Sequence, residues 1–145
     1  MSREALLDVN VLVALFDADH VHHEAAHRWF GDHRPSGWAT CPLTENGVVR
    51  ILSNPAYSPS AERPTDVARR LESFRASGHH VFWPDDLSLC DSRVFNLTVG
   101  HRQLTDVYLL GLATAHGGRL ATFDRSISLK AVRGARADDL VVIDA

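Results

Sequence analysis

Four acidic residues stand apart from the other acids of this 145-residue chain by their local sequence. Each lies beside apolar residues or near the start of an expected helix, whereas most of the eighteen acids are expected on the solvated surface. The four are Asp8 in LLDVN, Glu45 in LTEN, Asp106 in LTDVYLL and Asp124 in ATFDR. By contrast, four acids occur as doublets beside turn-like residues and are predicted to be exposed: Asp85, Asp86, Asp138 and Asp139.

Carboxylates that converge on one site need a counter-charge. Two of them about 4 Å apart repel by roughly 4 kcal/mol at an effective dielectric constant near 20, so either their pKa values rise or a cation neutralises them. Hard oxygen ligands favour Mg²⁺ or Mn²⁺, and Mg²⁺ held by few carboxylates keeps several water molecules. A water deprotonated there can attack phosphorus. The four acids therefore indicate metal-dependent hydrolysis of a phosphodiester that leaves a 5′-phosphate and a 3′-hydroxyl.

The spacing of apolar residues predicts the elements that must position these acids. Short apolar runs alternate with amphipathic stretches, which is typical of an α/β domain with a mostly parallel sheet. Strands are expected over residues 5–9, 37–41, 79–83, 119–122 and 140–143. Helices are expected over residues 11–16, 23–30, 42–52, 87–97 and 107–115, with another from Pro64 to a stop at Gly78.

This arrangement would bring the four acids to one edge of the sheet. Asp8 lies at the carboxyl end of the first strand, and Asp124 follows the strand that ends at residue 122. Glu45 and Asp106 lie near the starts of two helices. In a parallel sheet, the carboxyl ends of strands and the helix starts that follow them share one rim, where active sites form. The acids are therefore expected to meet in one crevice.

Polar and basic neighbours have expected supporting roles. Thr105 is predicted to cap the helix from which Asp106 projects, and Asn10 and Thr122 could donate hydrogen bonds that orient carboxylates. Four arginines lie near the acids in the sequence and could bind RNA phosphates, although Arg50 and Arg119 could equally be solvated surface residues. They are Arg50, Arg102, Arg119 and Arg125.

Composition sets the limits within which these residues act. The length suits a single domain over residues 1–145, and no apolar run is long enough to span a bilayer. The start lacks a signal-peptide pattern, so a cytoplasmic protein is expected, with Cys41 and Cys90 reduced and serving as small apolar fillers. The net charge of −3 argues against a simple polyanion-binding surface, but it becomes +1 when four carboxylates are set aside.

The contexts of the four acids resemble those of PIN domains, and within them the VapC-type toxins of bacterial toxin–antitoxin pairs. The resemblance covers essentially the whole chain and includes LLDVNVLVALFD with Asp8 and Asn10, then Glu45, the Thr105–Asp106 pair and the closing Thr122–Asp124 segment. It implies a three-layer α/β/α sandwich, Mg²⁺ or Mn²⁺ dependence, endonucleolytic RNA cleavage, homodimerisation and neutralisation by a cognate antitoxin. Asp8, Glu45, Asp106 and Asp124 match the catalytic and metal-binding positions, and Asn10, Thr105 and Thr122 match the supporting positions.

Two alternatives to a ribonuclease remain open from the sequence. His23-Glu24-Ala25-Ala26-His27 matches the H-E-x-x-H pattern of zinc proteases, in which two histidines share a helix face. The short helix expected here, with Trp29 and Phe30 as core anchors, fits that class poorly. The second alternative is a module with the same fold that binds RNA without cutting it.

Overall fold

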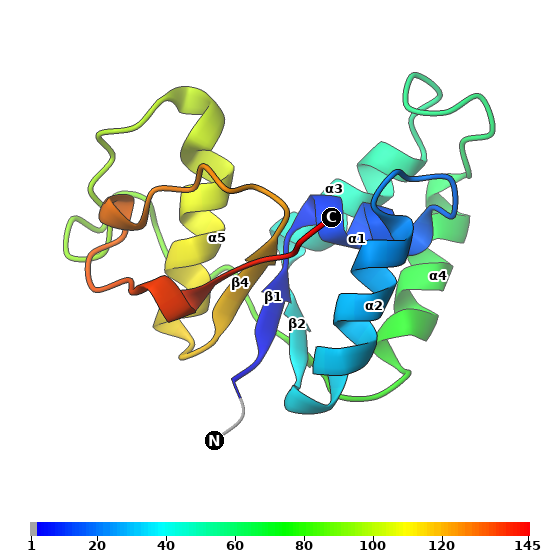
Figure 1. Cartoon of the computed structure of the whole chain (residues 1–145). Coiled ribbons are helices and arrows are strands. Elements are labelled where there is room, and N and C mark those ends of the chain that lie inside the picture. The colour runs from blue at the N-terminus through cyan, green and yellow to red at the C-terminus, as the bar shows by residue number, and fades with distance from the viewer. Residues whose placement is uncertain (1–2) are drawn as a thin grey trace.

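The computed structural model describes residues 3–145, which form α-helices around a five-stranded sheet (Figure 1). The strand order is β3-β2-β1-β4-β5, and every neighbouring pair is parallel. The strands are β1 (Ala5–Leu7), β2 (Trp38–Thr40), β3 (His80–Phe82), β4 (Arg119–Thr122) and β5 (Leu140–Val142). The helices are α1 (Val9–Phe16), α2 (His23–His33), α3 (Pro42–Leu52), α4 (Pro64–Arg75) and α5 (Leu104–Ala115). Short 3₁₀ helices are η1 (Arg34–Ser36), η2 (His101–Gln103), η3 (Leu129–Ala131) and η4 (Ala137–Asp139).

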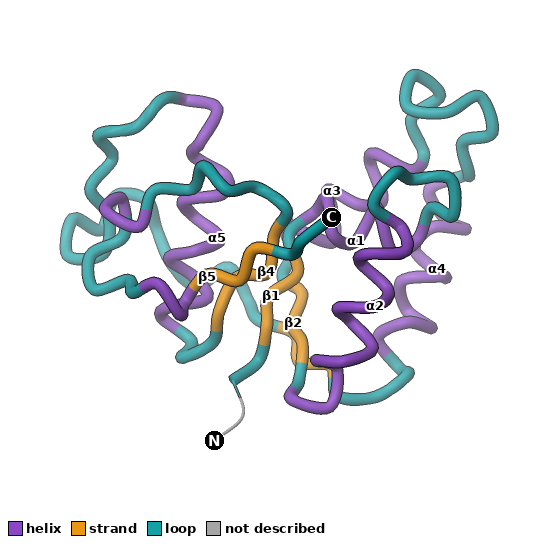
Figure 2. Tube along the Cα trace, viewed as in Figure 1, coloured by secondary structure: helices purple, strands orange, loops and turns teal. Residues whose placement is uncertain are grey.

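The sheet separates two apolar clusters, as the alternation of side chains along β1 requires. Ala5 and Leu7 pack into the cluster formed with α1 to α4, whereas Leu6 packs into the cluster formed with α5. Helices α1 to α4 lie on one side of the sheet, and α5 lies on the other with long irregular segments (Figures 1 and 2). The predicted three-layer α/β/α fold with a parallel sheet is confirmed.

The helices α1 and α3 begin at residues that stabilise a helix start. Asp8 is the N-cap of α1 and accepts a hydrogen bond from the Val9 amide at 2.7 Å. Pro42 opens α3, where its fixed φ suits the first turn. The Thr44 hydroxyl oxygen accepts from the Cys41 amide at 3.0 Å and so satisfies a backbone donor at this helix start.

Helix α5 is buried on most sides, as its nearly continuous apolar sequence predicts. Close packing there depends on Gly111, because a Cβ atom at this position would lie 2.5 Å from the Phe95 ring. Phe95 belongs to the irregular segment between β3 and η2, which covers α5. The layer opposite the four helices is therefore built from one helix and the loops packed against it.

The helix predicted over residues 87–97 is wrong, because the chain there forms successive turns. Most of its apolar residues do pack against the α5 cluster, which explains why their spacing suggested a helix. The Ser88 hydroxyl accepts from the Cys90 amide at 3.0 Å, and the Asp91 carboxylate accepts from the Arg93 amide at 3.0 Å. Such local bonds offer the backbone an alternative to helical hydrogen bonding.

Two expectations about exposure are also corrected. Asp139 is buried, with 6% of its surface exposed, because the Arg3 guanidinium donates to its carboxylate at 2.5 Å. Asp138 is exposed, as predicted. Cys90 is exposed rather than a core filler, whereas Cys41 is buried and burial raises the pKa of its thiol to about 11. Other element boundaries differ from the predictions by up to three residues.

Candidate active site

Asp8 and Asp124 are joined through one hydroxyl at the carboxyl edge of β1 and β4. The Thr122 hydroxyl donates to Asp8 Oδ2 at 2.8 Å, and its oxygen accepts from the Asp124 amide at 3.1 Å. Asp8 is 5% exposed, and this burial raises the pKa of its carboxyl despite the hydrogen bonds from Thr122 and Val9. The side chain is therefore fixed at both oxygens before any ligand binds.

Asp106 completes a group of three electrostatically coupled carboxyls. It lies in the first turn of α5, and burial followed by the charges of Asp8 and Asp124 raises its pKa to about 7. Asp124 differs, because hydrogen bonds from the Ser126 hydroxyl and amide lower the pKa of its carboxyl. The first turn of a helix carries partial positive charge, but that field does not offset the other two acids.

These three acids have the donor chemistry that a hard divalent cation requires. Among residues 3–145, no ion pair links any of the three to a basic side chain. Within that same range, no three His, Cys, Asp or Glu side chains already stand in a geometry that could hold a metal ion. Within the described part of the chain, this negative charge therefore has no basic partner, which fits cation binding. The carboxylates would have to draw closer around the ion.

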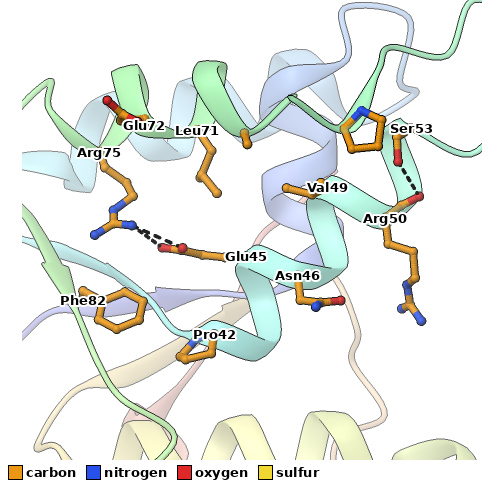
Figure 3. A pocket seen from close by; sticks show the side chains of 12 residues that line it. Pro42, Glu45, Asn46, Val49, Arg50, Ser53, Leu71, Glu72, Arg75 and Phe82 are labelled. Carbon is orange, nitrogen blue, oxygen red and sulfur yellow. Dashed lines mark hydrogen bonds and ion pairs between the residues drawn. The ribbon is translucent and has the colours of Figure 1, made fainter. Parts of the chain in front are cut away.

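Glu45 faces a different partner. Its carboxylate pairs with Arg75 of α4, at 3.3 Å to Oε1 and 3.2 Å to Oε2, and Figure 3 shows the side chain pointing toward that arginine. The Thr40 hydroxyl donates to Oε2 at 2.6 Å, and its oxygen is 2.7 Å from His80 Nε2. Because the Thr40 proton goes to Glu45, His80 Nε2 must be the donor in this contact.

Sequence reasoning missed the three residues around Glu45. Arg75 is thirty residues away in the chain, and His80 is on an edge strand, so no local pattern connects them with the glutamate. Burial, followed by the charge of Arg75, lowers the pKa of His80 to about 4. The imidazole is therefore neutral at physiological pH. The one local signal is Thr40, because it ends β2 shortly before the helix that contains Glu45.

The predicted supporting residues differ in position. Thr122 is fully buried and contacts two acids, as described above. Asn10 is exposed in the first turn of α1, and its supporting role stays a prediction. Thr105 as an N-cap is wrong, because α5 begins at Leu104 and η2 precedes it without a break. Thr105 is thus an exposed residue of the first turn, beside Asp106.

The four arginines also lie in different places. Arg50 is exposed on α3, and Arg102 is exposed in η2, just before the helix of Asp106. Arg125 is exposed and pairs with Asp144 at 2.6 Å. Arg119 begins β4, at the amino edge of the sheet opposite the acids, so its nearness to Asp124 in the sequence does not bring it to the site. RNA binding by Arg50, Arg102 and Arg125 stays a prediction.

The H-E-x-x-H histidines bond to the end of a neighbouring helix. His23 Nδ1 is 2.7 Å from the Ala14 carbonyl oxygen, and His27 Nε2 is 2.9 Å from that of Leu15. Since a carbonyl only accepts, both rings donate, and they satisfy carbonyls that the end of α1 leaves unpaired. The shared helix face that suggested zinc binding therefore serves the packing of α2 on α1.

A substitution of His23 should show whether this residue stabilises the fold or binds zinc. His23→Ala is expected to lower the free energy of unfolding by about 1–2 kcal/mol, because a buried carbonyl loses its donor. Urea titration monitored by circular dichroism measures this change. Binding of Mn²⁺ should be unaffected in the folded variant. A requirement for zinc that disappears with His23 would contradict this interpretation.

The double role of Thr122 gives a second prediction. Thr122→Val keeps the shape but removes the hydroxyl, and Mn²⁺ affinity is expected to fall by about tenfold, the lower range for loss of a group that orients a metal ligand. Calorimetric titration with Mn²⁺ measures the affinity. Thr122→Ser is the matched control, because it retains the hydroxyl and should bind Mn²⁺ nearly as well as the parent chain. Equal losses in both variants would show that packing, and not the hydroxyl, matters.

Known proteins resemble this chain along most of its length. The PIN domain family matches residues 5–133. Among curated relatives from Mycobacterium tuberculosis (strain ATCC 25618 / H37Rv), Ribonuclease VapC44 is 46% identical over 144 residues, covering 96% of this chain and 99% of that protein. Ribonuclease VapC38 is 51% identical over 123 residues, covering 85% and 86%. Ribonuclease VapC39 is 43% identical over 132 residues, covering 90% and 95%.

The protein is an α/β/α sandwich with acidic side chains at the carboxyl edge of its parallel sheet, the edge at which such folds bind ligands. The chain belongs to the PIN domain family. The predicted resemblance to VapC-type proteins is confirmed by the similarity to these relatives along most of the chain.

Proposed function

We propose that this protein is a divalent-metal-dependent endoribonuclease and the toxin of a toxin–antitoxin pair. The observation that carries this proposal is the group of coupled carboxyls Asp8, Asp106 and Asp124, none of which pairs with a basic side chain among the described residues. The relatives that cover most of the chain are named ribonucleases, which supports RNA as the substrate class. Mg²⁺ is the expected ion, and Mn²⁺ offers similar coordination.

Each acid would contribute to the reaction from a defined support. Asp8, Asp106 and Asp124 would hold the ion, with Glu45 as a fourth ligand after it leaves Arg75. When bound, the cation would supply charge neutralisation and activation of water for attack on phosphorus. Thr122 keeps Asp8 oriented, and Ser126 keeps Asp124 ionised. Asp106 would lose its proton as the cation offsets the neighbouring charges.

RNA cleavage with different ions tests the proposal. End-labelled RNA incubated with purified protein and Mg²⁺ or Mn²⁺ should yield fragments with 5′-phosphates, and EDTA should stop the reaction. Zinc should not substitute. RNA that binds with both ions but stays intact would contradict the nuclease and favour the RNA-binding module.

The partner proposals have separate tests. We infer a cognate antitoxin from the VapC-type relatives, and a homodimer from the same resemblance. Half-exposed Val81 and Phe82 on edge strand β3 are an apolar surface that a partner could cover. Copurification with the product of a short neighbouring reading frame would support the antitoxin, and sedimentation would give the oligomeric state.

The cellular location is also a proposal. Among the helices of residues 3–145, none has the length and apolar character needed to cross a bilayer. A ribonuclease that acts on cellular RNA would work in the cytoplasm, which cell fractionation can test.

A further inference from the structure

We propose that Arg75 is a latch that holds the Glu45 carboxylate away from the other acids and competes with the divalent cation for it. Under this inference, which rests on the proposed function, Arg75 sets the cation affinity of the site. Glu45 would then be a conditional ligand, available only when the arginine yields. The competing interaction is the ion pair between Glu45 and Arg75, the last residue of α4.

The contacts of Glu45 leave neither oxygen without a partner. Arg75 Nη1 lies 3.3 Å from Oε1 and 3.2 Å from Oε2, and Thr40 donates to Oε2. The Glu45 side chain is 17% exposed and the Arg75 side chain 37% exposed, so water screens this ion pair less than it screens a fully exposed one. A cation that binds this carboxylate would therefore compete with the guanidinium for it.

The arginine is itself supported and has space to move. Its guanidinium lies over the Phe82 ring, 5.0 Å from the ring centroid. It lines a groove of about 670 Å³ between α3 and α4 (Figure 3). Arg75 can thus swing away from Glu45 within the groove without disturbing the core beneath.

The charge distribution explains why such a latch would matter. Asp8, Asp106 and Asp124 have no basic partner among residues 3–145, whereas Glu45 has a full positive charge at contact distance. Two cations, one from the protein and one from solution, would therefore compete for a single carboxylate. Removing the protein's cation should favour the metal.

Mn²⁺ affinity measured by calorimetry tests the latch directly, without reliance on cleavage. Arg75→Met is expected to bind Mn²⁺ about fivefold or more tightly than the parent chain, in the range of typical coupling between two ligands. Arg69→Met removes the same charge from an exposed position of the same helix, and Arg69 has no ion pair with Glu45. Its affinity should change by less than about twofold, because exposed charges are screened.

Further variants assign the effect to Glu45. In a Glu45→Gln background, Arg75→Met should not increase Mn²⁺ affinity, because the carboxylate for which the two cations compete is gone. Arg75→Lys, which keeps the charge but not the fork, should bind Mn²⁺ with intermediate affinity and serves if the methionine variant does not fold. Unchanged or weaker binding in a folded Arg75 variant would overturn the latch, and so would a gain that survives without Glu45.

Asp8→Asn separates this inference from the proposed function. If Asp8→Asn weakens Mn²⁺ binding and the Arg75 variants do not strengthen it, only the latch is wrong. If Asp8→Asn leaves Mn²⁺ binding unchanged, the proposed cation site is wrong and the latch fails with it.

Discussion

Replacing Asp8 or Asp106 with asparagine is expected to lower the rate of RNA cleavage by about a thousandfold or more. Loss of a metal ligand removes several kcal/mol of transition-state stabilisation, and roughly 4 kcal/mol corresponds to a factor near 10³. Asparagine caps helices about as well as aspartate, so α1 should keep its start in the Asp8→Asn chain. Initial rates on end-labelled RNA at saturating Mg²⁺ measure the effect.

Asp138→Asn is the matched control for these substitutions. Asp138 is exposed and lies in η4, just before β5 begins, at the edge of the sheet opposite the acids. Cleavage should stay within about twofold of the parent rate, as expected for a surface substitution away from the site. Growth arrest on expression should likewise persist in this variant and vanish in the other two. Arrest that survives Asp8→Asn would refute the catalytic assignment.

The second large effect is on stability: Asp106→Asn should be more stable than the parent chain at pH 8 without divalent ions. Burial and two neighbouring charges raise the folded-state pKa of Asp106 from 3.8 to about 7. Allowing for solvent screening at this half-buried group, ionisation costs ~1–2 kcal/mol of folding free energy. The expected rise in Tm is about 2–4 °C for each kcal/mol.

The direction of the pH dependence follows from proton binding. Between pH 4 and pH 7 the unfolded chain has already lost this proton while the folded chain keeps it, so the Asp106 contribution lowers stability as pH rises. The difference between parent and variant should therefore be small near pH 4 and full above pH 7. Differential scanning calorimetry across this range measures it. Saturating Mg²⁺ should reverse the order, because only the parent retains every ligand. Equal stability at pH 8 would contradict the proposed repulsion.

Much of the fold could be predicted because local signals and tertiary packing agree in these segments. Pro42 at the start of α3 and the short segment Arg119–Thr122 after two glycines predicted those two elements with their observed boundaries. The segment 87–97 could not be predicted, because its apolar residues reach the α5 cluster from turns. Thr105 was misassigned because a 3₁₀ turn enters α5 directly, so no residue there needs to act as a side-chain cap.

The candidate site was predictable where strand ends position it. Asp8 and Asp124 follow neighbouring parallel strands, and their link through Thr122 needs only that topology. The environment of Glu45 could not be predicted, because it depends on where α4 returns along α3. The same holds for the burial of Asp139, which depends on Arg3 at the other end of the chain.

The histidine contacts beneath α2 have a consequence for recognising enzymes by short patterns. Wherever one helix lies across the exposed end of another, donors one turn apart can reach two successive carbonyls. His23 and His27 show that such helix packing places the two histidines of an H-E-x-x-H pattern one turn apart without a metal ion. Because a zinc-binding histidine also donates its second ring N–H to a carbonyl or carboxylate, a backbone contact does not by itself distinguish the two cases, and a third ligand beside both histidines is the sign of a zinc site.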